Sequence, residues 1–159
     1  MWKLSTPVNE EKFLKKIAWL SIIVSALFSL EIFDHSWNEL KDAHPIFFIF
    51  SIVVYLVLII TMLNLLSHIL ISTWDIRDVW LGRFQDEYFN AVNLKAAYYA
   101  LGVLGVFLLS VIWLDSLLPE AISSMSIQSF SKLSMGLGFL TYGSSIIWEL
   151  KQSDEIDCE

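Results

Sequence analysis

Hydrophobic residues fall in four long blocks that short polar segments separate. The longest block, residues 46–74, contains no Asp, Glu, Lys or Arg, no glycine and no proline. A helix of about 20 apolar residues crosses the ~30 Å hydrocarbon core of a bilayer, so each block is long enough for one crossing. The pattern predicts membrane-spanning helices at residues 17–33, 46–72, 96–118 and 130–150.

Composition agrees with this interpretation. Hydrophobic residues make up 56% of the 159 residues, against about 45–50% in an ordinary soluble domain. The first block follows lysines, as in a signal peptide, but it lacks an Ala-x-Ala cleavage site, so we expect a retained anchor. The four blocks fill residues 1–150 as a single domain and leave no room for a soluble catalytic domain. The acidic tail, residues 151–159, is expected to be disordered.

The positive charges predict the orientation. Eight of the ten basic residues fall on one side of a four-span arrangement: Lys3, Lys12, Lys15, Lys16, Arg77, Arg83, Lys95 and Lys151. Basic loops stay in the cytoplasm, which places both termini and the central segment there. Short connections make successive spans antiparallel neighbours. The predicted fold class is therefore all-α, an integral membrane four-helix bundle of up-down topology in a prokaryotic cytoplasmic (inner) membrane.

Small residues recur at four-residue spacing on the first, third and fourth predicted spans. Such stripes let helix backbones approach closely in lipid. We expect most of these contacts within one chain, with part of the surface left for oligomerisation. The predicted packing residues are Ser21, Ser25, Ser29, Ala96, Ala100, Ser134, Gly138 and Gly143.

A polar stripe lies on one face of the second predicted span, within an arc of roughly 80° at about 100° per residue. Ionisable residues inside spans are functional candidates, and a histidine near its pKa of ~6.5 is suited to proton relay. In the structural interpretation, which we expect, Asn64 and His68 face inward and hydrogen-bond neighbouring helices. The stripe consists of Thr61, Asn64, His68, Ser72 and Asp75.

Catalytic chemistry is not expected. Cys158 is the only cysteine, which excludes a thiol relay and a cysteine-based metal site. The chain contains neither a Gly-rich phosphate loop nor a nucleophile elbow. Glu31 and His35 lie one helical turn apart, but zinc needs three or four well-placed ligands, so we expect a solvated acidic loop there. We expect no enzyme, no cofactor and no metal.

The central segment, residues 75–95, combines charge with aromatic and aliphatic residues at four-residue spacing, which predicts a helix at the headgroups or extensions of both spans. We expect Asp86 and Glu87 near a helix N-terminus, where carboxylates are favourable. Lys95 is expected to reach the headgroups. The alternative is a docking surface for a partner, with the candidates Arg77, Arg83, Asp86, Glu87 and Lys95.

One part of this segment resembles a pattern in small, uncharacterised prokaryotic multi-span membrane proteins. The resemblance consists of Asp86-Glu87, Val92 and Lys95-Ala96. In those proteins an arginine follows the two acidic residues, and this chain has Tyr88 instead. The resemblance implies a multi-span membrane protein and no particular chemistry.

Two classes of function remain. In the first, the chain is a non-enzymatic membrane subunit that oligomerises or accompanies a larger membrane protein. In the second, it is a small channel or transporter that moves ions, protons or a solute along the polar stripe. Few charges lie inside the spans, which favours the first class. The expected partners are the lipid bilayer and other membrane proteins, including further copies of this chain, and not nucleic acid.

Overall fold

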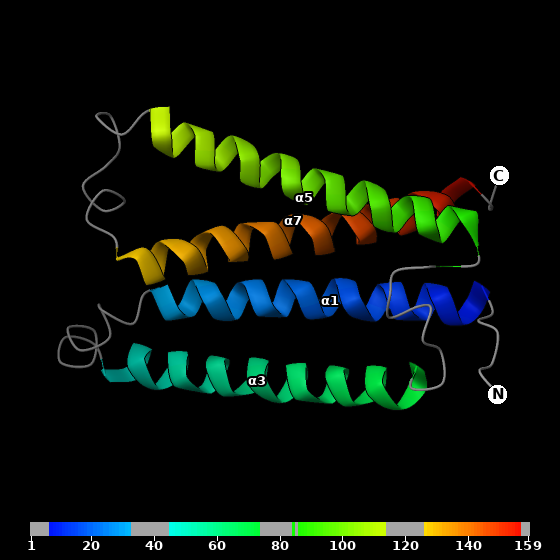
Figure 1. Cartoon of the computed structure of the whole chain (residues 1–159). Coiled ribbons are helices and arrows are strands. Elements are labelled where there is room, and N and C mark those ends of the chain that lie inside the picture. The colour runs from blue at the N-terminus through cyan, green and yellow to red at the C-terminus, as the bar shows by residue number, and fades with distance from the viewer. Residues whose placement is uncertain (1–6, 33–44, 74–83, 85, 114–125, 157–159) are drawn as a thin grey trace.

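The computed structural model describes residues 7–32, 45–73, 84, 86–113 and 126–156. Within these residues the chain forms four helices: α1 (Pro7–Ile32), α3 (Pro45–Thr73), α5 (Glu87–Trp113) and α7 (Ile127–Ile156). Each helix runs antiparallel to the one before it, as the colours in Figure 1 show. The all-α prediction is confirmed. Helices α1 and α5 begin well before the predicted spans. Helix α7 continues to Ile156, so the prediction of a disordered tail is wrong for residues 151–156.

The residues at the helix starts explain where the helices begin. Pro7 and Pro45 open α1 and α3, where a fixed φ suits the helix and the missing N–H has no partner to lose. Asp86 and Ser126 cap α5 and α7. Each side-chain oxygen accepts a hydrogen bond from a backbone N–H of the first helical turn, which would otherwise lack an acceptor.

The N-terminal and C-terminal helices form the centre of the molecule. The most extensive packing joins α1 to α7, then α5 to α7, whereas α3 has α1 as its only substantial neighbour among the described helices. In Figure 1 the order across the molecule is α5, α7, α1, α3. The prediction that all successive helices would pack together is therefore wrong for α3 and α5, which lie at opposite edges.

Close approach of backbones explains this order. A Cβ added at Gly143 of α7 would lie 2.5 Å from the carbonyl oxygen of Ala18 in α1. Ser21 and Ser25 are buried on the same face of α1, and Gly136 lies in ordinary contact with Ser25. These small residues let α1 and α7 pack tightly, as small-residue stripes do in lipid. Parts of the first and fourth predicted stripes thus meet inside one chain.

Helix α3 is held differently because it contains neither glycine nor alanine. Its side facing α1 carries half-buried residues at alternating spacings of four and three: Ser51, Tyr55, Leu58, Met62, Leu65 and the buried Ile69. The opposite side of α3 is exposed along its described length.

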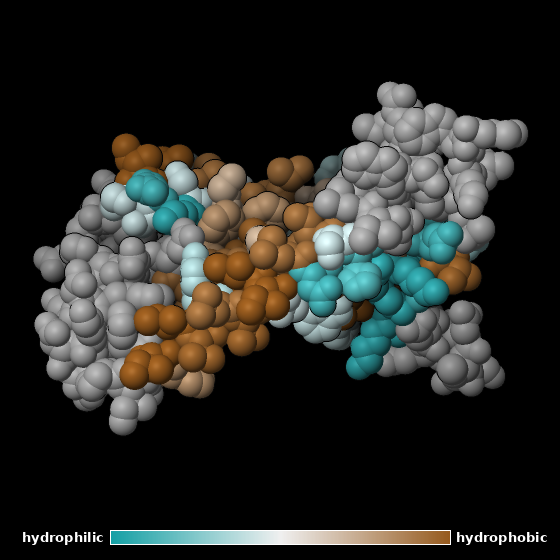
Figure 2. All heavy atoms as spheres, turned by 90° about the horizontal axis from the view of Figure 1, so that it is seen from below, coloured by the Kyte–Doolittle hydropathy of each residue, from teal (hydrophilic) through white to brown (hydrophobic). Residues whose placement is uncertain are grey.

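The largest buried cluster lies at the end of the molecule where α1 and α5 begin and α7 ends. It combines Leu14 and Ala18 of α1, Phe89, Val92 and Ala96 of α5, and Ile146 and Leu150 of α7. Figure 2 shows hydrophilic residues gathered toward this end and hydrophobic residues across the middle. The largest cluster of buried side chains thus lies at the end of the molecule that carries the charged residues. Toward the other end, α5 diverges from α7 (Figure 1).

Three of the described helices are long and apolar enough to cross a membrane, over Pro7–Leu30, Ile49–Ile69 and Glu87–Trp113. Helix α7 is not among them. Its apolar residues are interspersed with glycine, serine and threonine, and it carries Lys132 and Glu149. Of the four predicted spans, three therefore lie on helices that meet the length and apolarity of a membrane crossing, and the fourth lies on the less apolar α7.

Candidate functional site

Polar residues join α5 to α7 at the charged end of the molecule. The Lys95 ammonium lies 2.6 Å from a Glu149 carboxylate oxygen. The Tyr88 hydroxyl donates to the backbone carbonyl of Glu149 at 3.1 Å. Lys95 also lies over the Tyr99 ring, 6.0 Å from its centre. Lys95 was expected to extend toward headgroups, but in the structure it pairs with α7.

A second bond between these helices lies closer to the apolar region. The Tyr142 hydroxyl donates to the side-chain oxygen of Asn93 at 2.5 Å. Both residues are partly buried, so the bond satisfies a phenol and an amide oxygen that water reaches poorly. Together with the Lys95–Glu149 pair, it fixes the register of α5 against α7.

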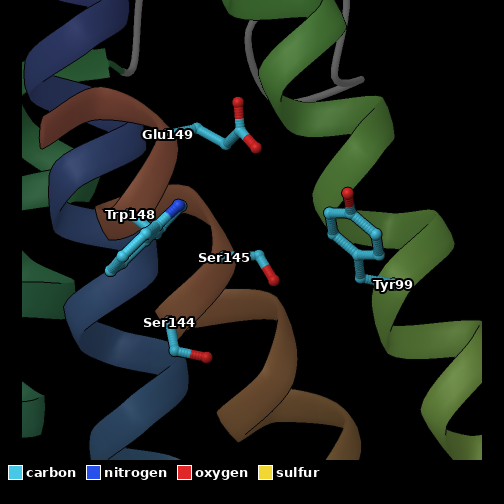
Figure 3. A pocket seen from close by; sticks show the side chains of 5 residues that line it. All are labelled: Tyr99, Ser144, Ser145, Trp148 and Glu149. Carbon is cyan, nitrogen blue, oxygen red and sulfur yellow. The ribbon is translucent and has the colours of Figure 1, made fainter. Parts of the chain in front are cut away.

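Beside the ion pair is a pocket of about 430 Å³ lined by Tyr99, Ser144, Ser145, Trp148 and Glu149. Figure 3 shows Tyr99 of α5 facing Ser145 and Glu149 of α7 across the gap. The Ser144 hydroxyl donates to the carbonyl of Leu140 within its own helix. The pocket offers hydrogen-bonding and aromatic contacts at the boundary between charged and apolar residues.

An apolar groove of about 650 Å³ opens between α1 and α5, with α7 as its floor. Gly138 lies in this floor, and Ala100 of α5 is in one wall. A Cβ added at Gly138 would lie 2.9 Å from the end of the Leu104 side chain. Gly138 therefore contacts a movable side chain of α5 and not a backbone.

The start of α5 is bound to α1 through a buried carboxylate. Asp86 accepts the Tyr88 N–H at 2.8 Å, and the backbone N–H of Asp86 donates to the fully buried Glu10 of α1 at 3.1 Å. In a capping box, the third residue of the helix bonds the N–H of the cap. Here that position is Phe89, and Glu10 from another helix makes the bond instead.

The polar stripe of α3 faces away from the other helices. Thr61, Asn64 and His68 are all exposed. The expectation that Asn64 and His68 face inward and bond to other helices is therefore wrong within one chain. These polar residues lie on the side of α3 opposite the side that packs against α1.

The polar groups on this outer face differ in how they are satisfied. The Thr61 hydroxyl donates to the carbonyl of Val57, and the Ser67 hydroxyl donates to the carbonyl of Asn64. Hydroxyl groups bond within their own helix in this way. Within the described residues, no hydrogen bond forms to the Asn64 amide or the His68 ring. Asn64 is thus a polar group inside an apolar helix with its side chain open to the surroundings.

The structure brings together only part of the predicted site. Ala96, Gly138 and Gly143 contribute to packing, Ser134 is partly buried, and Ser29 is exposed. Glu87 is exposed at the first turn of α5. Asp75, Arg77, Arg83 and His35 lie outside the described residues, as do the side chains of Ser72 and Glu31. Among the described residues, no three of His, Cys, Asp and Glu come together as a metal site.

Sequence reasoning missed Glu10, Asn93 and Tyr142. Glu10 shares a helical face with Leu14, Ala18, Ser21 and Ser25, at spacings of four, four, three and four. That spacing is a signal that this carboxylate is buried. The pairing of Asn93 with Tyr142 depends on how α5 and α7 are positioned, which no local pattern contains.

The geometry defines a helical protein with three candidate membrane spans and polar contacts concentrated at one end. Comparison with protein families, curated proteins and solved structures finds no match to this chain.

Proposed function

We propose that this chain is a non-enzymatic subunit of a membrane assembly, in which other copies or another membrane protein cover α3. The observation that carries the proposal is the position of α3. It is an edge helix with one substantial neighbour, yet its exposed side carries an amide and an imidazole. An isolated polar group in hydrocarbon costs several kcal/mol by transfer estimates. A partner that covers this side removes that cost.

The proposed arrangement in the membrane has four crossings and both termini in the cytoplasm. Helix α7 contains 30 residues, about 45 Å at ~1.5 Å per residue, which exceeds the hydrocarbon thickness. It lies between α1 and α5, so these neighbours shield much of its less apolar surface from lipid. The charged end with Lys95 and Glu149 then lies at the cytoplasmic boundary. The resemblance at residues 86–96 is consistent with a multi-span protein of this kind.

Reporter fusions test this arrangement. A reporter that is active only in the cytoplasm should work when fused after Glu159 and fail when inserted in the segment 34–44. A reporter active only outside should give the opposite result. A C-terminal fusion that is active only outside would contradict the orientation, because it would place most basic residues on the wrong side.

The assembly itself is tested in native membranes. A tagged chain of 18.3 kDa should be recovered by brief chemical cross-linking in complexes of at least twice that mass. The control is the same chain solubilised in excess detergent before the cross-linker is added, where chance proximity is lost. A chain that stays monomeric at every expression level would contradict the proposal.

The alternative function, conduction along the polar stripe, has less support within one chain. The pocket beside the ion pair and the apolar groove are formed by α1, α5 and α7, without a residue of α3. The stripe lies on α3 and faces outward. A monomeric chain with pH-dependent flux in vesicles, abolished by His68→Leu, would favour this alternative.

A further inference from the structure

We infer that the outer face of α3 pairs with α3 of a second copy, and that the two Asn64 amides bond to each other. This inference rests on the proposed function, because it names the partner that covers the same face. It concerns a central row of exposed residues on α3, opposite the side that packs on α1: Val53, Val57, Ile60, Asn64 and Ser67.

The spacing of this row fits helix pairing. Its residues are four, three, four and three positions apart, which is the repeat that keeps one seam facing a partner helix in a left-handed pair. Val53, Val57 and Ile60 are each at least half exposed. Their β-branched side chains have few rotamers to lose on packing. The row therefore provides a narrow, stiff apolar ridge with one amide in it.

Asn64 is the residue that specifies a second copy as the partner. An amide both donates and accepts hydrogen bonds, so two identical amides satisfy each other. Copies inserted by the same charge rule have the same orientation in the membrane. A twofold axis along the membrane normal then places both Asn64 residues at the same depth. The contact is self-complementary, as a closed dimer requires.

The depth of Asn64 distinguishes it from its polar neighbours. Asn64 lies eight residues before position 72, the end of the predicted span, or about 12 Å at ~1.5 Å per residue. His68 lies four residues before that end, so it is closer to the headgroups and water. Thr61 and Ser67 already bond within α3. Asn64 is thus the polar group on this face that gains most from a partner.

Single cysteines in the full chain test the pairing. In a Cys158→Ser background, Val57→Cys and Ile60→Cys report on the outer face, and Leu58→Cys and Leu65→Cys report on the face against α1. After oxidation in native membranes, we expect disulfide-linked dimers at least tenfold more abundant for the outer pair. Equal cross-linking on both faces, or cross-linking only on the α1 side, would overturn the inference.

Substitutions at Asn64 test the bond. Energy transfer between labelled chains in vesicles, followed as lipid is added, measures the dimer. Interhelical side-chain bonds in membranes suggest that Asn64→Leu weakens association by about threefold to twentyfold. Thr61→Val is the matched control and should leave association unchanged, because its hydroxyl bonds within its own helix. Unchanged helix content verifies folding, and Asn64→Leu dimers of undiminished affinity would refute the amide bond.

The results separate this inference from the proposed function. If the wild-type chain forms oligomers but the α3 cysteines do not cross-link, the inference fails and the proposed function stands. If the outer cysteines are shielded from labels in native membranes but pure vesicles contain only monomers, a different protein covers α3, and the second-copy inference is again wrong. If the chain is monomeric and unshielded in both settings, both fail.

Discussion

Gly143→Ala should lower the stability of the folded chain more than alanine at Gly138 or Gly102. The new Cβ would lie 2.5 Å from the carbonyl oxygen of Ala18 and 2.9 Å from Ile22. A backbone carbonyl in a helix cannot rotate aside, so α1 and α7 must separate. Overpacking of this kind costs about 1–3 kcal/mol. Thermal unfolding in mild detergent should show a clearly lower midpoint.

Two other glycines serve as matched controls. At Gly138 the nearest atom is the end of the Leu104 side chain, which can change rotamer, so Gly138→Ala should have a small effect. At Gly102 nothing lies within 4 Å, and Gly102→Ala should be neutral or slightly stabilising because alanine favours helix. Equal losses at Gly143 and Gly102 would show that α1 and α7 do not approach closely at Gly143.

Glu10→Ala should destabilise the chain by about 2 kcal/mol, since hydrogen bonds to charged groups contribute roughly 1.5–3 kcal/mol. The Glu10 carboxylate is fully buried and accepts the N–H of Asp86. Its removal leaves that N–H without its acceptor and releases the start of α5 from α1. Hydrogen exchange in the first turn of α5 should therefore accelerate, together with a lower unfolding midpoint.

The adjacent residue provides the control. Glu11 forms an exposed pair with Lys15, one turn away in the same helix, and such pairs contribute only about 0.3–0.5 kcal/mol. Glu11→Ala should change stability little. Glu10→Gln should retain part of the wild-type stability, because the amide oxygen still accepts a hydrogen bond. If Glu10→Ala behaves like Glu11→Ala, the link between α1 and α5 contributes nothing.

The predicted packing residues show which helix contacts a local sequence pattern can predict and which it cannot. Spacing alone identified Ser21, Ser25 and the glycines of the fourth block as packing residues. This was possible because two helix backbones approach closely only where the side chains between them are small. Which glycine meets which helix was not predictable. Gly143 packs on α1 and Gly138 faces α5, since one helix at the centre presents different faces to two neighbours.

The polar stripe of α3 shows where sequence reasoning failed. Periodicity placed Thr61, Asn64 and His68 on one side of the helix, and they are exposed together. It did not show whether that side faces inward. In water, polarity would settle this question, because apolar faces turn to the core. For a helix apolar on nearly all sides, the position of its neighbours decides it.

The sequence by itself determined the elements: four long helices and the apolarity that makes three of them candidates for membrane crossing. These properties depend on residue type and spacing along one helix, so they can be read locally. Only the tertiary structure decided that α1 and α7 form the centre, that α3 lies at the edge, and that Glu10 caps α5. Those outcomes depend on which surfaces approach most closely, and that is a property of pairs of helices far apart in the chain.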